Sequence, residues 1–257
     1  MLSSRFVKAA RLMVSACLAI ALFSIPAPAR AQFFSNIYPN FFQLQQPGRL
    51  DVLLFGGGYV SDKDGDLQQG FQVEQSVTSY VGVFGRMSGY QLWIGHGFDS
   101  PLAPGSGPSA RLNFGRAQGG IDFMLYPGTH LFVSGGKDFG DSNADIFEAD
   151  LSSWLFLHSR HPLNFASSTI YDSENGVTST SFDVQDIVRS TESYMVLLGG
   201  GGAMYNGGFL SGSQGQGGPD LGFYYRPWRA GIAIQAGYGS AHQYGQLSMY
   251  KTLSFLE

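Results

Sequence analysis

The side chains best suited to chemistry in this sequence are a pair of histidines beside a serine. His158 is followed directly by Ser159. Neighbouring residues of a strand point to opposite faces, so these two do not make a nucleophile–base pair on one surface. His158 and His161 have His-x-x-His spacing, but a zinc site needs at least one further ligand, and none is adjacent. Solvated turn histidines are the favoured interpretation.

Two further motifs fail on their spacing. The run Asp62–Asp66 places acids at the first, third and fifth positions of a calcium loop, but its glycine comes at the fourth position instead of the sixth. Val73 stands where that loop needs glutamate. The glycine-rich run 199–208 lacks the G-x-G-x-x-G order of a nucleotide-binding loop. We therefore predict no enzyme, no catalytic or metal-binding residue and no cofactor.

The N-terminus has the features of a secretory signal peptide. Arg5, Lys8 and Arg11 form a basic start, an apolar run follows, and small residues at Ala29 and Ala31 predict cleavage after position 31. The sequence around the single cysteine weakly resembles a lipoprotein signal, but the apolar run continues past it. Cleavage removes that cysteine, so the exported domain has no disulfide.

The composition is unusual for a soluble domain. Charged residues make up only 13%, aromatic residues 14%, and there are 36 glycines. The leader takes four of the 15 basic residues and none of the 19 acidic ones, which leaves a net charge of about −8. This charge argues against nucleic acid as a partner. Few charges with many glycines and aromatics are typical of a barrel whose outer surface meets lipid.

Polar and apolar residues alternate with the period of two expected of strands, over segments long enough to cross a membrane. In 229–238, for example, alanine, isoleucine and tyrosine alternate with arginine, glycine and glutamine. The pattern predicts about twelve strands, near 50–60, 70–85, 88–98, 110–126, 129–139, 145–157, 163–172, 178–190, 193–206, 219–226, 229–240 and 243–255.

The connections between these segments alternate in length. Short ones include Arg86–Ser88, Pro127–Gly128 and Pro227–Trp228, whereas longer ones such as 61–69 and 207–218 are rich in polar residues or glycine. Short periplasmic turns alternating with longer external loops are typical of outer-membrane barrels. Aromatic residues near strand ends predict belts at the two membrane interfaces: Tyr59, Tyr90, Phe98, Tyr126, Phe139, Tyr171, Tyr205, Tyr225, Trp228, Tyr238, Tyr244 and Phe255.

On these features residues 49–257 resemble a bacterial outer-membrane β-barrel of the porin-like class, without resembling a specific family. The expected fold is all-β, a closed antiparallel up-and-down transmembrane barrel of ten to twelve strands, in which closure removes unpaired strand edges. Residues 32–48 are expected to be an N-terminal periplasmic segment. The resemblance implies that Phe255 contributes to the signal read by the barrel-assembly machinery of Gram-negative bacteria, although Leu256 and Glu257 follow it.

If the apolar faces meet lipid, the opposite faces line the interior. Alternation places charged residues of both signs there: Asp51, Glu74, Arg86, Arg116, Asp122, Glu148, Asp150, Asp183, Arg189, Asp220, Arg226 and Arg229. Such charges either pair and fill the lumen or line a pore that selects solutes by its field. Lys251 interrupts the apolar face of the last strand. We expect it near the periplasmic edge, or turned inward by a bulge.

The favoured function is a narrow passive channel for small polar solutes or ions in the cell outer membrane, with outer-membrane lipid as the surrounding partner. Three alternatives stay open: a closed structural or surface-recognition barrel, an outer-membrane hydrolase, and a soluble exported β-protein. The sequence does not predict the solute or the oligomeric state.

Overall fold

The computed structural model describes residues 47–61, 64–94, 110–155, 163–174, 176–207, 214–239 and 242–255. The predicted signal peptide, residues 32–46 and the two residues after Phe255 lie outside these ranges, as do His158, Ser159 and His161. Within the described part of the chain, no helix is long and apolar enough to cross a membrane.

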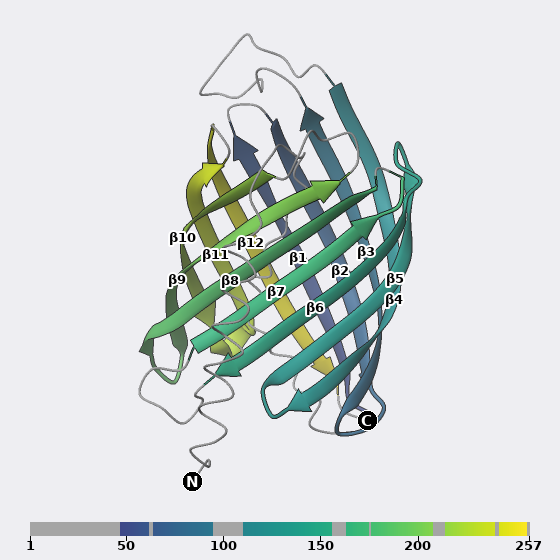
Figure 1. The fold of residues 1–257 in the computed structure, drawn as a ribbon. Helices are drawn as coiled ribbons and strands as arrows, with labels where there is room; N and C mark the ends of the chain where they lie inside the picture. The colour runs from purple at the N-terminus through teal and green to yellow at the C-terminus, as the bar shows by residue number, and fades with distance from the viewer. Residues whose placement is uncertain are drawn as a thin grey trace, which may run out of the picture.

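Twelve strands and one short 3₁₀ turn make up the described chain (Figure 1). Their bounds are β1 Leu50–Ser61, β2 Asp64–Ser76, β3 Val81–Ile94, β4 Ala110–Tyr126, β5 Thr129–Gly140, β6 Asp145–Leu155, β7 Leu163–Asp172, β8 Val177–Ser190, β9 Tyr194–Gly207, β10 Gln214–Tyr225, η1 Arg226–Trp228, β11 Ala230–Gly239 and β12 His242–Phe255.

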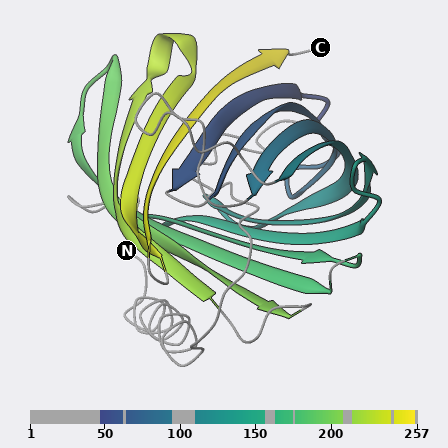
Figure 2. The same cartoon turned by 90° about the horizontal axis from the view of Figure 1, so that it is seen from above.

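Every strand pairs antiparallel with its neighbours in sequence, and β1 pairs with β12, which closes the barrel. The closing register runs from Leu50 opposite Phe255 to Ser61 opposite Tyr244. Seen from above, the sheet curves round on itself (Figure 2). The predicted fold, a closed barrel of twelve antiparallel strands, is therefore confirmed, and no strand is left with an open edge.

Alternate residues of each strand are exposed and buried because neighbouring side chains point to opposite sides of the single wall. The outward set is apolar and includes Leu54, Phe71, Val83, Ile232 and Leu253. The inward set is largely polar. An apolar outer band over a polar interior is the arrangement of a transmembrane barrel, in which lipid covers the outside.

Two ends of the barrel can be distinguished. The terminal end is where β1 begins and β12 ends, and the loop end is opposite. At the terminal end, short connections join the strands at 77–80, 127–128, 191–193 and 226–229. The predicted Pro127–Gly128 turn is confirmed, and Gly128 adopts a φ of 81°, which favours glycine.

The predicted turn at Arg86–Ser88 is wrong. β2 ends at Ser76, and the chain turns at 77–80, where the Thr78 hydroxyl accepts hydrogen bonds from the N–H groups of Tyr80 and Val81. β3 then runs straight through Arg86. The predicted loops are also too long, because β2 already begins at Asp64 and β10 at Gln214.

The outward aromatic residues gather at both ends, as predicted. Tyr126, Trp228 and Phe255 lie at the terminal end, and Phe139, Tyr171 and Tyr238 toward the loop end, all exposed on the outside. Three predicted belt members are wrong, because Tyr59, Tyr90 and Tyr244 lie on the inward set of their strands. Phe98 and the side chain of Tyr205 fall outside the described residues.

Lys251 lies on the outer face without a bulge. It pairs with Leu54 of β1 and with Ala230, the first residue of β11, which places it toward the terminal end. There its long side chain can reach the interface, where a charge costs less than at mid-depth.

Candidate functional site in the barrel lumen

The inward face of the barrel carries an unusual number of buried carboxylates. Those on the strands with less than a tenth of their surface exposed are Asp51, Asp66, Glu74, Asp122, Asp138, Glu148, Asp150, Asp172, Asp183 and Asp220. Because a buried charge is costly unless it is paired or hydrogen-bonded, the partners of these groups define the chemistry of the lumen.

Arg86 forms the centre of a network that crosses from β2 to β6. Its Nη1 lies 2.9 Å from the Glu148 Oε1, its Nη2 lies 3.6 Å from the Asp150 Oδ2, and its Nε donates to the Gln72 Oε1 at 2.9 Å. Gln118 of β4 donates to the second oxygen of Glu148 at 2.5 Å. Arg86, on β3, thus neutralises two carboxylates on β6, although β4 and β5 lie between these strands.

Arg116 and Asp138 form a second, two-point ion pair between β4 and β5. The Nε–Oδ1 distance is 2.6 Å and the Nη2–Oδ2 distance 3.0 Å, and both side chains are almost fully buried. The guanidinium also lies 5.0 Å from the centre of the Tyr90 ring, whose hydroxyl accepts a hydrogen bond from Gln68. The two-point ion pair is strong and directional, and it holds β4 and β5 together on the inward face.

His130 and Asp122 pair at the terminal ends of β5 and β4. The His130 Nδ1 lies 2.9 Å from the Asp122 Oδ2, and Glu74 of β2 interacts with the same carboxylate. Ser152 faces His130 directly across the β5–β6 ladder, yet neither the Ser152 hydroxyl nor the His130 Nε2 has a hydrogen-bond partner among the described residues. The set therefore lacks the nucleophile–base hydrogen bond of an acyl-transfer site.

A fourth cluster joins the first and last strands at the terminal end. Arg49 binds Asp51 at 2.9 Å and donates to the Ser254 hydroxyl at 3.0 Å. Arg229 also donates to Ser254, which in turn donates to Asp51. These contacts hold the closing β1–β12 seam.

The wall from β8 to β12 is different. Its inward positions hold small or neutral residues, including Gly199, Gly201, Ala203, Gly222 and Ala233. Toward the terminal end an apolar cluster fills the lumen beside this wall: Leu53, Phe55, Met195, Leu197, Tyr224 and Tyr250, with Trp154 and Ile187 packed against it. The inward carboxylates on this wall are Asp183 and Asp220.

The structure places nine of the twelve predicted lumen residues on the inward face, where they are buried or half-buried. They are Asp51, Glu74, Arg86, Arg116, Asp122, Glu148, Asp150, Asp183 and Asp220. Arg226 and Arg229 do not line a strand, because Arg226 is the first residue of the 3₁₀ turn at the terminal rim and Arg229 caps the end of that turn.

Arg189 lies outside the barrel, so its predicted inward position is wrong. A bulge between Ile187 and Arg189 shifts the register of β8 by one residue, which moves Arg189 opposite the outward Val196. Its guanidinium lies 5.6 Å from the centre of the Tyr194 ring. A bulge of this kind has no signature in the alternation of the sequence.

Two buried, paired residues of the lumen wall are not among the predicted lumen residues. Asp138 was passed over, and His130 was not considered, although both follow the inward alternation of β5 with Phe132 and Ser134. Counting inward positions along the predicted strand 129–139 would have found both. Their partners depend on the register between strands, which the sequence does not show.

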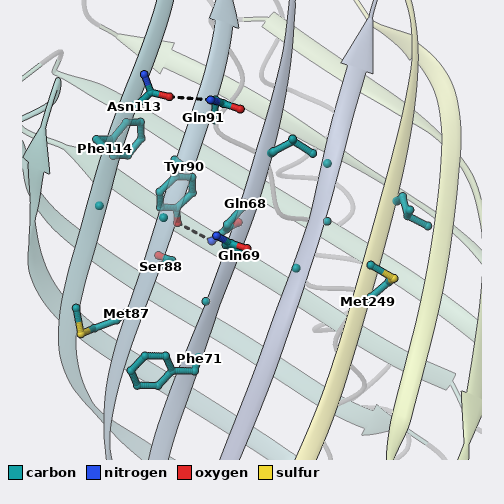
Figure 3. Close-up of a pocket in the computed structure, with 18 of the residues that line it drawn as sticks. Gln68, Gln69, Phe71, Met87, Ser88, Tyr90, Gln91, Asn113, Phe114 and Met249 are labelled. Atoms are coloured by element: carbon teal, nitrogen blue, oxygen red, sulfur yellow. Dashed lines mark hydrogen bonds between the residues drawn. The ribbon is translucent and has the colours of Figure 1, made fainter. Parts of the chain in front are cut away.

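A groove of about 1050 Å³ lies on the outer face of β12 and of β1 to β5 (Figure 3). Glycines form its floor and apolar side chains its sides: Gly56, Gly58, Gly89, Gly115, Leu67, Phe71, Met87, Phe139, Leu247 and Met249. Gln91 and Asn113 join by a hydrogen bond of 3.0 Å toward the loop end. The groove belongs to the apolar outside of the barrel and is separate from the lumen.

Within the described residues, no group of three or more histidines, cysteines, aspartates and glutamates is placed to hold a metal ion.

Comparison with solved structures agrees with this architecture. The chain is similar to the COG4313 outer membrane channel from Pseudomonas putida F1, with a TM-score of 0.55 and 9% identity over 85% of this chain and 100% of that one. The CymD monoaromatic hydrocarbon channel matches at a TM-score of 0.45 and 11% identity, over 90% and 95% of the two chains. No protein-family model matches the sequence, and no curated protein matches it.

The architecture and the first of these comparisons define the class. The chain has the fold of bacterial outer-membrane β-barrels of the porin-like type. Among the solved members of that class, the twelve described strands are similar in arrangement to the COG4313 channel. At 9% identity, the likeness concerns the fold alone.

Proposed function

We propose that the protein is a narrow passive channel of the outer membrane that passes small polar solutes or ions and prefers cations. The observation that carries the proposal is the acidic inward face of a closed barrel. On its strands, ten buried carboxylates stand against the two inward arginines, Arg86 and Arg116. An excess of carboxylates along a pore raises the local concentration of cations and lowers that of anions.

The outer surface supports the proposed location. An apolar band flanked by aromatic residues at both ends suits outer-membrane lipid as the surrounding medium. Export by residues 1–31 and insertion by the barrel-assembly machinery, with Phe255 as part of the signal, complete the proposal. The COG4313 outer membrane channel, which is similar in fold, supports the proposal.

The inward side chains set the size of any path. Most of them are buried, because ion pairs fill the side formed by β2 to β6 and the apolar cluster fills the terminal half of the side formed by β8 to β12. A channel through this interior is narrow and passes solutes close to its wall. It therefore discriminates by charge more strongly than a wide pore does.

Single-channel recording tests the function. The mature protein, refolded in detergent and inserted into a planar bilayer, is expected to give small, uniform conductance steps. A heat-unfolded sample treated in the same way is the control. A folded protein that gives no steps above this control would overturn the channel function.

A closed barrel is the second candidate, and a specific observation favours it. The Arg86 network and the Arg116–Asp138 pair are fully engaged within the wall, as they would be in a lumen packed for stability. A structural or surface-recognition role through the loop end would then follow. Absence of conductance together with heat-modifiable gel mobility is the result that supports this second candidate.

A further inference from the structure

The groove on the outer face of β12 and β1 to β5 continues toward the loop end into a second hollow. The groove has a volume of about 1050 Å³, and the second hollow has a volume of about 370 Å³. Gly58, Leu67 and Leu247 line both, and Val60 and Trp93 line the second. Leu67 folds over Gly58, where an added Cβ atom would lie 2.8 Å from the Leu67 Cδ2. The two hollows therefore form one furrow, with the Leu67 side chain between its parts.

The furrow exists because glycines take outward positions on neighbouring strands. Gly56, Gly89 and Gly115 stand in one row across β1, β3 and β4, joined through Gln69 of β2. Apart from its chain neighbours, no described residue lies within 4 Å of a Cβ atom added at Gly89, so the floor is open there. Exposed apolar side chains stand around this floor: Leu67, Phe71, Met87, Phe139, Leu247 and Met249.

The furrow runs along the strands over the depth of one membrane leaflet. On β3 it extends from Met87, near the middle of the strand, to Trp93, six positions further toward the loop end. At about 3.3 Å per residue this length is roughly 20 Å, and a strand tilt of about 40° reduces it to about 15 Å of depth. The hydrocarbon core of a bilayer is about 30 Å thick, so the furrow covers about half of it.

Amide side chains give the furrow a polar patch nearer the loop end (Figure 3). The Gln91 Nε2 donates to the Asn113 Oδ1 at 3.0 Å, and the exposed Gln69 side chain forms no hydrogen bond with the described residues. Amide groups are costly on a surface that lipid covers unless they find hydrogen-bond partners. A lipid carries ester or amide carbonyls where its acyl chains begin, and the N–H groups of Gln69 and Asn113 can donate to them.

We infer that the furrow binds an acyl chain of an outer-leaflet lipid, with the amides of Gln69 and Asn113 at the carbonyl end of the chain. The furrow belongs to the apolar band that lipid covers, so acyl chains are the molecules that reach it. A chain within the furrow contacts protein at its sides as well as below, and so gains more dispersion contacts than a chain on a flat wall.

The choice of leaflet follows from the two ends of the barrel. Short turns are periplasmic in barrels of this class, which makes the loop end the external one and places the furrow in the outer leaflet. The site rests on the proposed outer-membrane location. It does not require that the channel conducts.

Quenching of tryptophan fluorescence by brominated acyl chains tests the site. Trp93 lines the furrow, whereas Trp228 is exposed at the terminal end. Trp154→Phe/Trp228→Phe keeps Trp93 as the single tryptophan, and Trp93→Phe/Trp154→Phe keeps Trp228. Each barrel, refolded in detergent micelles, is titrated with phosphatidylcholine that carries brominated chains. Quenching of Trp93 is expected to saturate near one lipid per barrel and to persist when more detergent is added, whereas quenching of Trp228 should fall with the lipid fraction of the micelle.

A substitution in the floor locates the bound chain. Gly89→Leu, in the barrel that keeps Trp93, fills the furrow without meeting another described side chain, so the barrel should fold, and heat-modifiable gel mobility checks this. Its Trp93 quenching is expected to follow the lipid fraction of the micelle. Gly85→Leu is the matched control on the same face of β3, outside the furrow, where an added Cβ atom lies 4.0 Å from the Gln118 carbonyl oxygen. This control should keep the saturable quenching.

Two results would overturn the site. The first is Trp93 quenching that falls on detergent addition as Trp228 quenching does, as expected of lipid that only partitions into the micelle. The second is saturable quenching that Gly89→Leu leaves intact. A barrel that binds the lipid and gives no conductance would overturn the channel function and leave the site standing, and a conducting barrel without saturable quenching would do the reverse.

Discussion

The two sides of the lumen solve the problem of buried charge differently. The wall from β2 to β6 carries most of the inward carboxylates and supplies arginines that pair with them, in the Arg86 network and the Arg116–Asp138 pair. The wall from β8 to β12 carries two inward carboxylates, glycines and an apolar cluster, and its Asp183 and Asp220 have no cationic partner in the described chain. The first wall supplies cationic partners for several of its carboxylates, whereas the second supplies none for its pair.

The difference has a physical origin in side-chain length. Arginine spans two strands and so satisfies carboxylates at a distance, but it fills the lumen as it does so. Glycine leaves space and lets neighbouring side chains lie over it. We therefore expect the β2–β6 wall mainly to stabilise the barrel, and the β8–β12 wall to be the surface that a permeating ion meets in the proposed channel.

The largest expected effect on stability is in the wall from β2 to β6. Arg116→Met leaves Asp138 buried and unpaired, and we expect it to lower the free energy of unfolding by roughly 3–5 kcal/mol. Guanidinium unfolding in detergent measures this. The double variant Arg116→Met/Asp138→Leu should recover most of the loss, because it removes the stranded charge. Equal losses in the single and double variants would contradict the pairing.

The next effect concerns the glycines of the other wall. A Cβ atom at Gly199 would lie 2.1 Å from the Val184 carbonyl oxygen, a backbone atom that cannot rotate away. Gly199→Ala is expected to cost about 1–3 kcal/mol or to prevent assembly. Gly245→Ala on the outer face of β12 is the control, since nothing lies within 4 Å of its added Cβ. Similar gel mobility and stability for both variants would be evidence against the close approach of β9 at Gly199 to the Val184 carbonyl oxygen.

A smaller effect of opposite sign is expected at Asp183. With divalent cations chelated, Asp183→Asn removes one of two unpaired buried charges and adds a donor to Asp220. We expect it to raise the free energy of unfolding by up to about 1 kcal/mol. The corresponding change Glu148→Gln should lower the free energy of unfolding, because Glu148 is paired with Arg86. Destabilisation of similar size at both positions would remove the distinction between the walls.

The smallest effect is expected at Arg189. Because this side chain lies outside, over the Tyr194 ring, Arg189→Ala should leave the ion preference of the channel unchanged and cost only about 0.5–1 kcal/mol. A shift in reversal potential on this substitution would place Arg189 in the lumen and contradict the bulge.

Much of the fold was accessible from the sequence, since alternation, the short turns and the last strand are local signals. The twelve strands and the β1–β12 closure were predicted on that basis. The β2–β3 turn was not, because Val77–Tyr80 contains no glycine, proline or asparagine, and the Thr78 side chain forms it instead. The lumen residues followed from alternation until the bulge in β8 reversed the face of Arg189.

The partners within the site could not be predicted, because they depend on inter-strand register and on glycine positions far apart in sequence. Arg86 and Glu148 are separated by 62 residues, and only the paired register brings them within 2.9 Å. The contact of Asp183 with Asp220 likewise needs the glycines of an intervening strand.

The reversal potential across a KCl gradient tests the account most directly. The unaltered channel, with divalent cations chelated, is expected to show a clear preference for K⁺ over Cl⁻. The double variant Asp183→Asn/Asp220→Asn should lose a large part of that preference while its conductance steps persist. An unaltered channel that prefers Cl⁻, or a preference for K⁺ that the double variant keeps in full, would contradict the assignment of the β8–β12 wall as the surface that meets the ion.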